Sequence, residues 1–242
     1  MISRTKRLLG PVRQAVKLGA ANVSVEVFQR LMTYSILRNH FGEIASIPEH
    51  RSREELWNHA IGLFGAERKI TYVEFGVHRG HSIRYFAQHN GHPESQFIGL
   101  DSFEGLPEAW GPLDKGAFDT GGTLPVVDDR RVSFIKGWFQ DTWPELRQRL
   151  LASTADTLVV HYDADLYSST LFALSMIDSL KKSYLAMFDE FTGHETRALF
   201  NYCQAFNAEV SFVGKTTFES APNQLVCRIV PNGADLPSSA SR

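Results

Sequence analysis

The chain has 242 residues, with 25 Lys and Arg, 27 Asp and Glu, and a formal net charge of −2. This length fits one large α/β domain with a helical extension, and 43% hydrophobic residues can build a full core. The near-neutral charge gives no reason to expect a nucleic-acid partner. No apolar run approaches the roughly 18 residues of a transmembrane helix. Cys203 and Cys227 lack a metal-binding spacing, so we expect reduced thiols in a cytoplasmic protein.

Residues 1–68 predict a helical cap or lid. The first 18 residues carry five basic side chains and no acid. Such a basic amphipathic helix can lie on a membrane surface, but packing on its own domain or in a homo-oligomer is the simpler interpretation. A helical pattern runs from about 11 to 42, residues 46–50 are a connector, and Ser52 with Glu55 predicts a capping box for the next helix.

Residues 69–230 alternate between strand-like and helical segments, which is typical of a Rossmann-like, doubly wound α/β fold. We expect strands near 70–76, 96–101, 131–136, 157–162, 184–189, 208–214 and 224–230, and helices near 80–89, 143–152, 167–181 and 194–206. Because 215–223 is too short for a crossover helix, the last two strands should form a hairpin with one antiparallel strand. The expected sheet is therefore seven-stranded and mostly parallel, followed by a flexible tail at 231–242.

One connection, residues 104–130, is too long for a plain βα loop. It holds several glycines and prolines together with Trp110 and Phe118. Loops of this length within a compact domain are usually functional or disordered. The two aromatic residues favour an ordered lid on the substrate side.

Acidic residues stand at the ends of four of the expected strands. They are Glu74, Asp101, Asp163 and the pair Asp189 and Glu190. The carboxyl ends of parallel strands share one edge of a sheet, and ligands bind in the crevice outside that edge. Because an unpaired buried carboxylate is costly, these side chains predict a site that offers hydroxyls, an ammonium group or a metal ion.

The segment 74–80, Glu-Phe-Gly-Val-His-Arg-Gly, joins the first of these strands to a helix. Gly76 and Gly80 would let the backbone approach a ligand closely. The segment lacks the Gly-x-Gly-x-x-Gly pattern of dinucleotide sites and the Gly-Lys-Ser/Thr of a P-loop. An acid just before the turn repels phosphate and attracts an ammonium group, so S-adenosylmethionine fits better than NAD.

Two further segments complete a nucleoside site. Asp101 ends the next strand, where a carboxylate can accept both ribose hydroxyls. The alternative is that Asp101 only caps the following turn. Residues 137–141, Gly-Trp-Phe-Gln-Asp, could border an adenine; the alternative places Trp138 in the core.

The last acidic group predicts a divalent cation. Mg²⁺ prefers oxygen ligands, which Asp163, Asp189 and Glu190 could supply together. Asp165 or His161 could then accept the proton of a substrate hydroxyl. Alternatively, Asp165 caps the following helix and His161 is structural. Further along, His194 is near enough in sequence to reach the site edge, whereas Glu195 and Arg197 are expected at a surface or a helix end.

These segments together resemble class I S-adenosylmethionine-dependent methyltransferases, and more narrowly the macrocin O-methyltransferase family. The resemblance covers about 70–230 and rests on 74–80, on Leu-Asp-Ser-Phe-Glu-Gly-Leu-Pro-Glu at 100–108, on Gly-Trp-Phe at 137–139, on Asp-Ala-Asp-Leu-Tyr-Ser-Ser-Thr at 163–170 and on Asp-Glu at 189–190. Relatives often have Asp-Gly-Asp and Asp-Asp at the last two places, and a glycine pair where this chain has Lys182 and Ser183.

The resemblance implies a role for each part of the site. The expected cofactor-binding residues are Glu74, Gly76, Val77, Gly80, Ser82, Asp101, Ser102, Phe103, Gly137, Trp138 and Asp163. The expected metal ligands are Asp163, Asp189 and Glu190, and the expected catalytic residues are Asp163, Asp165 and His161.

The resemblance also implies metal-assisted transfer of a methyl group from S-adenosylmethionine to a hydroxyl of a sugar or glycosylated small metabolite. Three alternatives remain at this point. The acceptor could be a phenol or catechol, the protein could be a nicotinamide-dependent oxidoreductase, or it could be a non-catalytic binding module that retains the fold.

Overall fold

The computed structural model of the chain describes residues 24–234. The expectations for the basic segment 1–18 and for most of the tail 231–242 therefore lie outside the described residues. None of the helices between 24 and 234 combines the length and the hydropathy that a bilayer-spanning helix requires.

One mixed sheet organises the described residues, in the strand order β1-β7-β8-β6-β5-β2-β3-β4. Only β8 runs antiparallel to its neighbours, β6 and β7, and every other pair is parallel. The strands are β1 (Glu49–His50), β2 (Ile70–Phe75), β3 (Gln96–Asp101), β4 (Val132–Lys136), β5 (Thr157–Tyr162), β6 (Tyr184–Phe188), β7 (Glu209–Phe218) and β8 (Ala221–Val230). The mostly parallel sheet with one antiparallel strand is confirmed.

The sheet has one strand more than the sequence predicted. The connector 46–50 contributes β1, whose Glu49 lies opposite Lys215 in a parallel pair with β7. The final hairpin is also longer than expected, because its turn consists of Glu219 and Ser220 alone, both at positive φ. Two-residue hairpin turns are usually recognised in a sequence by Asn-Gly or by a glycine. Glu219 and Ser220 match neither pattern, so the sequence did not predict this turn.

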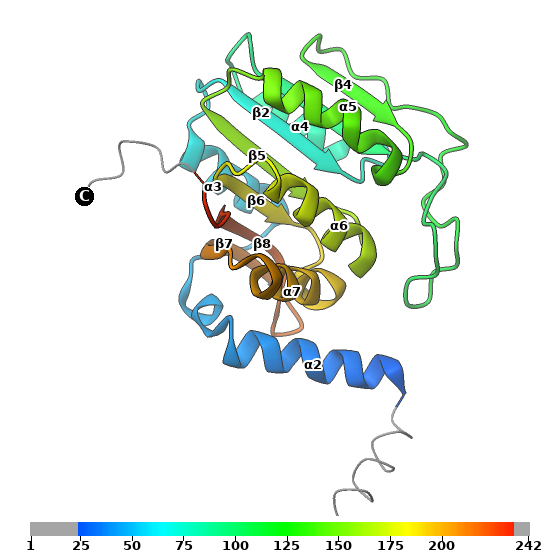
Figure 1. Cartoon of the computed structure of the whole chain (residues 1–242), viewed down its shortest axis with the longest axis vertical. Coiled ribbons are helices and arrows are strands. Elements are labelled where there is room, and N and C mark those ends of the chain that lie inside the picture. Colours follow the sequence, from blue (N-terminus) through cyan, green and yellow to red (C-terminus); the bar gives the residue numbers. More distant parts are fainter. Residues whose placement is uncertain (1–23, 235–242) are drawn as a thin grey trace, which may run out of the picture.

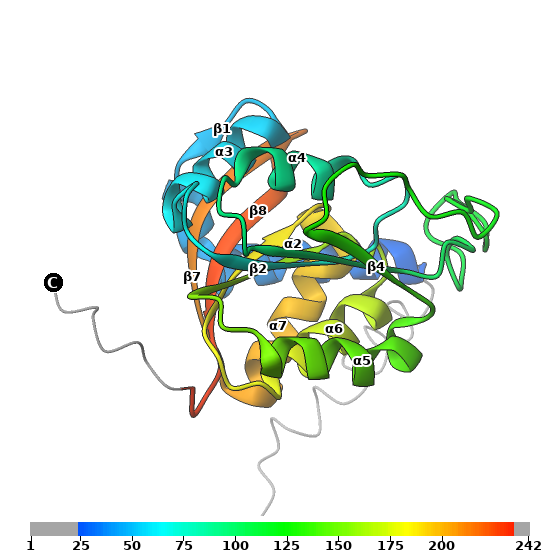
Figure 2. The ribbon, with the colours of Figure 1, turned by 90° about the horizontal axis from the view of Figure 1, so that it is seen from above.

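Helices cover both faces of the sheet, as a doubly wound fold requires (Figure 2). On one face lie α3 (Arg53–Phe64) and α4 (His81–His89); on the other lie α5 (Phe139–Ala152), α6 (Tyr167–Asp178) and α7 (Thr196–Phe206). The first described helix, α2 (Val25–Asn39), packs against α7 and leads through the 3₁₀ turn η1 (Gly42–Ser46) into the sheet (Figure 1).

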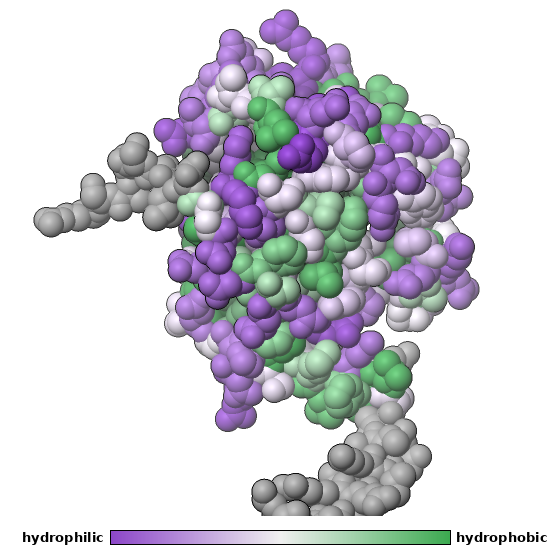
Figure 3. All heavy atoms as spheres, viewed as in Figure 1, coloured by the Kyte–Doolittle hydropathy of each residue, from purple (hydrophilic) through white to green (hydrophobic). Residues whose placement is uncertain are grey.

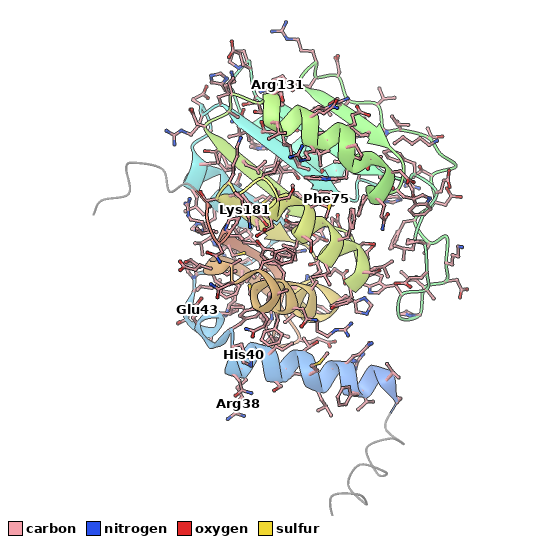
Figure 4. The ribbon with its side chains drawn as sticks, viewed as in Figure 1. Arg38, His40, Glu43, Phe75, Arg131 and Lys181 are labelled. Atoms are coloured by element: carbon pink, nitrogen blue, oxygen red, sulfur yellow. The ribbon has the colours of Figure 1, made fainter. Side chains whose placement is uncertain are left out.

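Each face of the sheet has its own hydrophobic core. On the α5–α7 face, the rings of Phe75, Tyr162 and Phe188 stack across three neighbouring strands at centroid distances of 5.9 and 5.0 Å (Figure 4 labels Phe75). On the opposite face, Trp57 of α3 packs into a cluster with Tyr72. Strands buried on both faces keep the sheet edge, and therefore the site at that edge, in a fixed geometry.

The predicted capping interaction at the start of α3 is present, with the return bond of Glu55 going to the N–H of Arg51 in place of that of Ser52. Ser52 accepts a hydrogen bond from the N–H of Glu55 at 3.2 Å, and the Glu55 carboxylate accepts one from the N–H of Arg51 at 2.9 Å. From this start α3 presents a row of buried apolar side chains to the sheet: Leu56, Trp57, Ala60, Ile61 and Phe64. Residues 49–64 thus supply both a strand and part of the core.

Candidate active site

A cavity of about 490 Å³ opens at the carboxyl ends of β2 to β6. Each of these five strands ends in a residue or a turn that lines it, so the sheet edge predicted from the acidic strand ends is a real concavity. The predicted site residues that line the cavity are Gly76, Val77, Asp101, Ser102, Gly137, Trp138, Asp163, Asp165, Asp189 and Glu190. Trp138 therefore lies at the site and is not a core residue.

Asp101 fixes the turn that follows β2. Its Oδ2 accepts the backbone N–H groups of Val77 and His78, both at 2.8 Å, and its Oδ1 accepts the N–H of Phe103 at 2.7 Å. An ionised carboxylate has about four acceptor positions, so these three bonds leave capacity for a ligand hydroxyl. Asp101 therefore caps the following turn, as the alternative interpretation proposed, and it also lines the cavity.

Gly76 is required by the protein's own backbone. Its φ is +92°, and a Cβ at this position would lie 1.8 Å from the carbonyl oxygen of Asp163. The ends of β2 and β5 meet here, with the N–H of Asp163 donating to the carbonyl of Phe75 at 2.9 Å. The sequence predicted close approach to a ligand; the structure shows close approach between two strand ends, at a residue that also lines the cavity.

A buried polar network lies on the α3–α4 side of the sheet. Ser82 donates to Glu74 Oε1, the Tyr72 hydroxyl lies 3.4 Å from Glu74 Oε2, and that hydroxyl is 2.9 Å from His161 Nδ1. Burial raises the pKa of Glu74 to about 8 and lowers the pKa of His161 to about 4. At neutral pH both groups are therefore neutral partners in a packed network.

Five predicted residues do not line the cavity. His161 is 1% exposed and Glu74 is fully buried, so neither is placed to touch a ligand in this conformation. The other three belong to the turns and the helix start around the site: Gly80, Ser82 and Phe103. Sequence spacing placed them near the site, but side-chain direction and packing decide which residues reach it.

The opposite end of the cavity is acidic. Burial, reinforced by the neighbouring carboxylate of Asp189, raises the pKa of Asp163 well above its ordinary value. Burial and then Glu190 raise the pKa of Asp165 to about 7, and burial with Asp189 raises the pKa of Glu190. The shared cause is a set of desolvated carboxylates that repel one another, which is typical of functional sites.

Asp165 does not cap α6, which removes that alternative. The N-cap of α6 is Leu166, which makes no side-chain capping bond, and the amide of Tyr167 instead donates to His194 Nδ1 at 3.1 Å. Asp165 itself has a φ of +56°, in the left-handed region. Asp tolerates this conformation better than most residues, and here it leaves the carboxylate on the cavity wall.

Asp189 has partners that sequence reasoning missed. Arg53, at the start of α3, places Nη2 3.7 Å from Asp189 Oδ2, and Gln224 donates to Oδ1 at 3.4 Å. Both partners are remote in sequence from the acidic strand ends, and no local motif signals their approach. They hold one carboxylate of the group in place and partly offset its charge.

The π-helical turn η2 (Phe191–Glu195) shapes the segment after β6. Glu195 Oε2 accepts the N–H of Glu190 at 3.0 Å, and Arg197 lies 5.1 Å over the ring of Tyr167. The helix-end part of the expectation for Glu195 and Arg197 is confirmed, since Glu195 is the N-cap residue of α7 and Arg197 lies in its first turn. The surface part is wrong, because the two residues are only 1% and 8% exposed. Their packing under α6 could not be read from charge alone.

The long loop 104–130 forms an ordered hairpin at its start. Leu106 pairs with Gly116 and Ala117 through two backbone bonds of 2.9 Å, and Trp110 pairs with Leu113 near the tip. Ser168 Oγ at the start of α6 lies 3.2 Å from Glu108 Oε1 of this hairpin. The loop lines one side of the cavity with side chains that include Leu106, Glu108, Trp110 and Phe118, and it extends beyond the sheet edge (Figure 1).

The three residues predicted to bind Mg²⁺ lie together at the acidic end of the cavity. Asp163, Asp189 and Glu190 all reach the cavity and offer only carboxylate oxygen, the donor that Mg²⁺ prefers. Burial and neighbouring carboxylates raise the pKa values of Asp163 and Glu190, so the protein does not balance the charge of these two groups. Within residues 24–234, however, no three His, Cys, Asp or Glu side chains are already arranged as a ligand set. The carboxylate oxygens are suitable ligands for a divalent cation, but the three side chains are not already positioned around one point as in a preformed metal site.

Comparisons with known proteins agree with this architecture. The family model for macrocin-O-methyltransferase (TylF) matches residues 124–210. A curated relative, the 8-demethyl-8-(2,3-dimethoxy-alpha-L-rhamnosyl)-tetracenomycin-C 4'-O-methyltransferase of Streptomyces olivaceus, is 34% identical over 125 residues, covering 42% of this chain and 45% of the relative. The matched part thus spans less than half the length of that relative.

The fold itself has solved counterparts. The crystal structure of the O-methyltransferase from Bacillus cereus in complex with SAH aligns with a TM-score of 0.50 and 10% identity, over 89% of this chain and 97% of that one. At this identity the likeness concerns the fold alone. The resemblance expected from the sequence is thereby confirmed: the chain is similar to class I S-adenosylmethionine-dependent O-methyltransferases, and its central segment to the macrocin O-methyltransferase family.

Proposed function

We propose that this protein transfers a methyl group from S-adenosylmethionine to a hydroxyl oxygen of a sugar or glycosylated small molecule. The proposal rests on the two unlike ends of one cavity. At one end Asp101 retains acceptor capacity beside a tight backbone turn, and at the other Asp163, Asp165 and Glu190 form an acidic wall. A neutral nucleoside fits the first end and a hydroxyl that must lose a proton fits the second.

The cofactor end would bind the nucleoside of S-adenosylmethionine. Asp101 would accept ribose hydroxyls, and the indole of Trp138, which is 37% exposed at the cavity, offers a flat apolar surface for adenine. No Gly-x-Gly-x-x-Gly segment is present to cradle a pyrophosphate, which disfavours a nicotinamide cofactor.

The acceptor end would position and deprotonate the hydroxyl. In the reaction an O–CH₃ bond forms as the S–CH₃ bond breaks, S-adenosylhomocysteine leaves, and the hydroxyl proton passes to a base. Asp165 is our candidate for that base, because it lines the cavity whereas His161 does not. Alignment of oxygen, carbon and sulfur within a rigid cavity can contribute about 7–11 kcal/mol to such a displacement.

We further propose that Asp163, Asp189 and Glu190 hold a divalent cation during turnover. A bound Mg²⁺ would lower the pKa of a coordinated acceptor hydroxyl. The support is the oxygen-only donor set and the burial of Asp163 beside other carboxylates, which raises the pKa of Asp163. Arg53 beside Asp189 would then steady one ligand.

The choice of a sugar hydroxyl follows the activity for which the Streptomyces relative is named, 4'-O-methylation of a rhamnosyl-bearing compound. A phenolic or catechol acceptor is the second candidate, because Trp110 and Phe118 supply aromatic surface on the lid side of the cavity. The acceptor screen below distinguishes the two.

The first test is calorimetric titration of the protein with S-adenosylmethionine in the presence of Mg²⁺ and again after EDTA. We expect micromolar binding in both conditions, because the cofactor end does not include the proposed cation ligands. Glycosylated and phenolic acceptors are then compared in a methyl-transfer assay with and without Mg²⁺. Absence of cofactor binding by folded protein would refute the methyltransferase proposal. Binding with transfer that is indifferent to EDTA would refute only the cation.

A further inference from the structure

Helix α2 has an ordinary inner face. Thr33 and Ile36 are buried where the helix packs against α7, and Thr33 Oγ1 donates to the carbonyl of Gln29 within the helix. This face anchors α2 to the body of the protein. An amphipathic surface helix would be expected to turn polar side chains outward on the opposite side.

The outer face of α2 is apolar instead. Val27, Leu31 and Tyr34 follow one another at the i, i+4 and i+7 positions of one helix face, and Phe28 lies beside them. Their exposed fractions are 49%, 62%, 56% and 58%, respectively. We call these four residues the α2 stripe. Figure 3 shows hydrophobic side chains gathered on this part of the surface.

Among the described helices, this concentration is confined to α2; outside the helices, the loop 104–130 exposes Phe118, Leu124 and Val126. Among the described residues, α3 and α5 each expose one large apolar side chain, Leu63 and Leu151, whereas α2 exposes the whole stripe and Val25 as well. Single exposed apolar residues are normal on a protein surface, but a contiguous apolar face marks an interaction site.

The charges around the stripe are positive. Arg30 lies within it in sequence, and Arg38 continues its spacing and points away from the body of the protein (Figure 4). Helix α2 (Val25–Asn39) carries Arg30 and Arg38 and one acid, Glu26, which gives the helix a formal charge of +1 in a chain of −2 overall. Apolar side chains flanked by arginine are the composition of helices that lie in an anionic membrane interface.

We propose that the α2 stripe binds the surface of an anionic lipid membrane, with the apolar side chains in the headgroup boundary and Arg30 and Arg38 against lipid phosphates. Charge selects this partner over a second copy of the chain, since two stripes facing each other would bring their arginines together. The inference does not depend on the proposed methyl transfer.

The position of α2 suggests what such binding would do. The N-terminal end of α2 and the hairpin of the 104–130 loop lie toward the same side of the molecule in both ribbon views (Figures 1 and 2). A protein held by the α2 stripe would therefore keep the lid side of its cavity near the lipid surface. If the proposed function holds, this orientation favours acceptors presented at a membrane.

The test is co-sedimentation of the full chain with vesicles of phosphatidylcholine and phosphatidylglycerol, with phosphatidylcholine vesicles for comparison. We expect binding to the anionic vesicles that weakens as salt is added. Phe28→Ser/Leu31→Ser should reduce the partition coefficient at least roughly tenfold, because it removes two large apolar side chains from the interface. Arg30→Gln/Arg38→Gln should reduce it by a similar factor, at roughly fivefold for each basic residue.

The matched control is Leu151→Ser on α5, which removes an equally exposed leucine, 52%, from another helix and should leave binding unchanged. Thermal unfolding establishes that each variant is folded. Equal binding of the wild type and the stripe variants to anionic vesicles would overturn the proposal. So would a dimer in light scattering that becomes a monomer in Phe28→Ser/Leu31→Ser while neither protein binds vesicles.

Discussion

The two ends of the cavity differ in how their carboxylates are satisfied. At the Asp101 end, three backbone amides already point at the side chain, at 2.7 to 2.8 Å. At the Asp163 end, burial and mutual repulsion hold the pKa values of Asp163, Asp165 and Glu190 above their ordinary range. The Asp101 carboxylate is therefore stabilised before any ligand binds and keeps acceptor capacity, whereas the carboxylates at the other end repel one another until a proton or a cation binds.

This difference separates binding from chemistry. A carboxylate held by backbone amides is preorganised, so it can hold a cofactor at little reorganisation cost. Carboxylates that repel one another store unfavourable energy that a positively charged ligand or a shared proton can relieve. Variants at the two ends should therefore have opposite effects on stability and affect different steps.

The largest effect is expected for Asp163→Asn. Methyl transfer should fall roughly 10²–10⁴-fold, while the Kd for S-adenosylmethionine changes by less than about threefold. The unliganded variant should be at least as stable as the wild type, because a repelling charge is removed. Initial rates, calorimetry and thermal unfolding measure the three quantities.

The control is Asp141→Asn, which changes an exposed carboxylate of α5. Equal losses of rate and cofactor affinity in Asp163→Asn would reverse our assignment of the two ends.

The junction between the ends should be highly sensitive to Gly76→Ala. A methyl group there would meet the Asp163 carbonyl oxygen at 1.8 Å with φ at +92°, so roughly 3 kcal/mol of unfolding free energy should be lost. Urea unfolding measures this. Gly42→Ala, where a Cβ would have nothing within 4 Å, should change stability by less than about 1 kcal/mol. Similar losses for both glycines would show that the junction is not crowded.

Asp101→Asn should weaken cofactor binding roughly tenfold and lower the unfolding free energy by about 1–2 kcal/mol, since it removes the charge that three amides share. Calorimetry and urea unfolding report the two effects. Asp119→Asn alters a comparable side-chain bond to the amide of Gly121 in the exposed loop; because Asp119 does not itself line the cavity, this variant should leave cofactor binding unchanged. A stabilised Asp101→Asn would contradict the proposed contrast between the ends.

The buried network below the cavity predicts a pH effect of known sign. The folded-state pKa of Glu74, about 8, lies above its ordinary value of 4.5, so protonated Glu74 stabilises the fold below about pH 4.5. That contribution is lost as pH rises toward 8, at about 1.4 kcal/mol per pH unit. Glu74→Gln should gain stability over the wild type between about pH 5 and about pH 8. A difference that does not change with pH, measured by urea unfolding, would show that Glu74 is ionised in the folded protein.

The smallest effect is expected at the lid. Ser168→Ala removes the bond to Glu108, at 3.2 Å, between α6 and the hairpin, so KM for the acceptor should rise about two- to fivefold with kcat unchanged. The control, Ser175→Ala, removes a hydroxyl that donates to a carbonyl within the same helix. A lower kcat with an unchanged KM would place Ser168 at the acidic end of the cavity.

Much of the fold and the position of the cavity could be predicted from the sequence, because the patterns that indicate them involve residues close together in the chain. Apolar runs of strand length, each ending in an acid, predicted both the parallel sheet and the edge where the cavity lies. The capping box of Ser52 and Glu55 predicted the start of α3 to the residue, since its hydrogen bonds span only one helical turn. The strings around Asp101 and Asp163 predicted the family resemblance.

Tertiary packing decided the rest, because it depends on residues far apart in the chain. Strand direction turned His161 and Glu74 into a buried network with Tyr72 and away from the cavity. The fold brought Arg53 to Asp189 across 136 positions of sequence. Which carboxylates reach a ligand, and which are neutralised by a neighbour, depends on side-chain direction and burial. The sequence by itself determined that acidic residues stand at the ends of the strands. Only the folded sheet determined which of their side chains face the site.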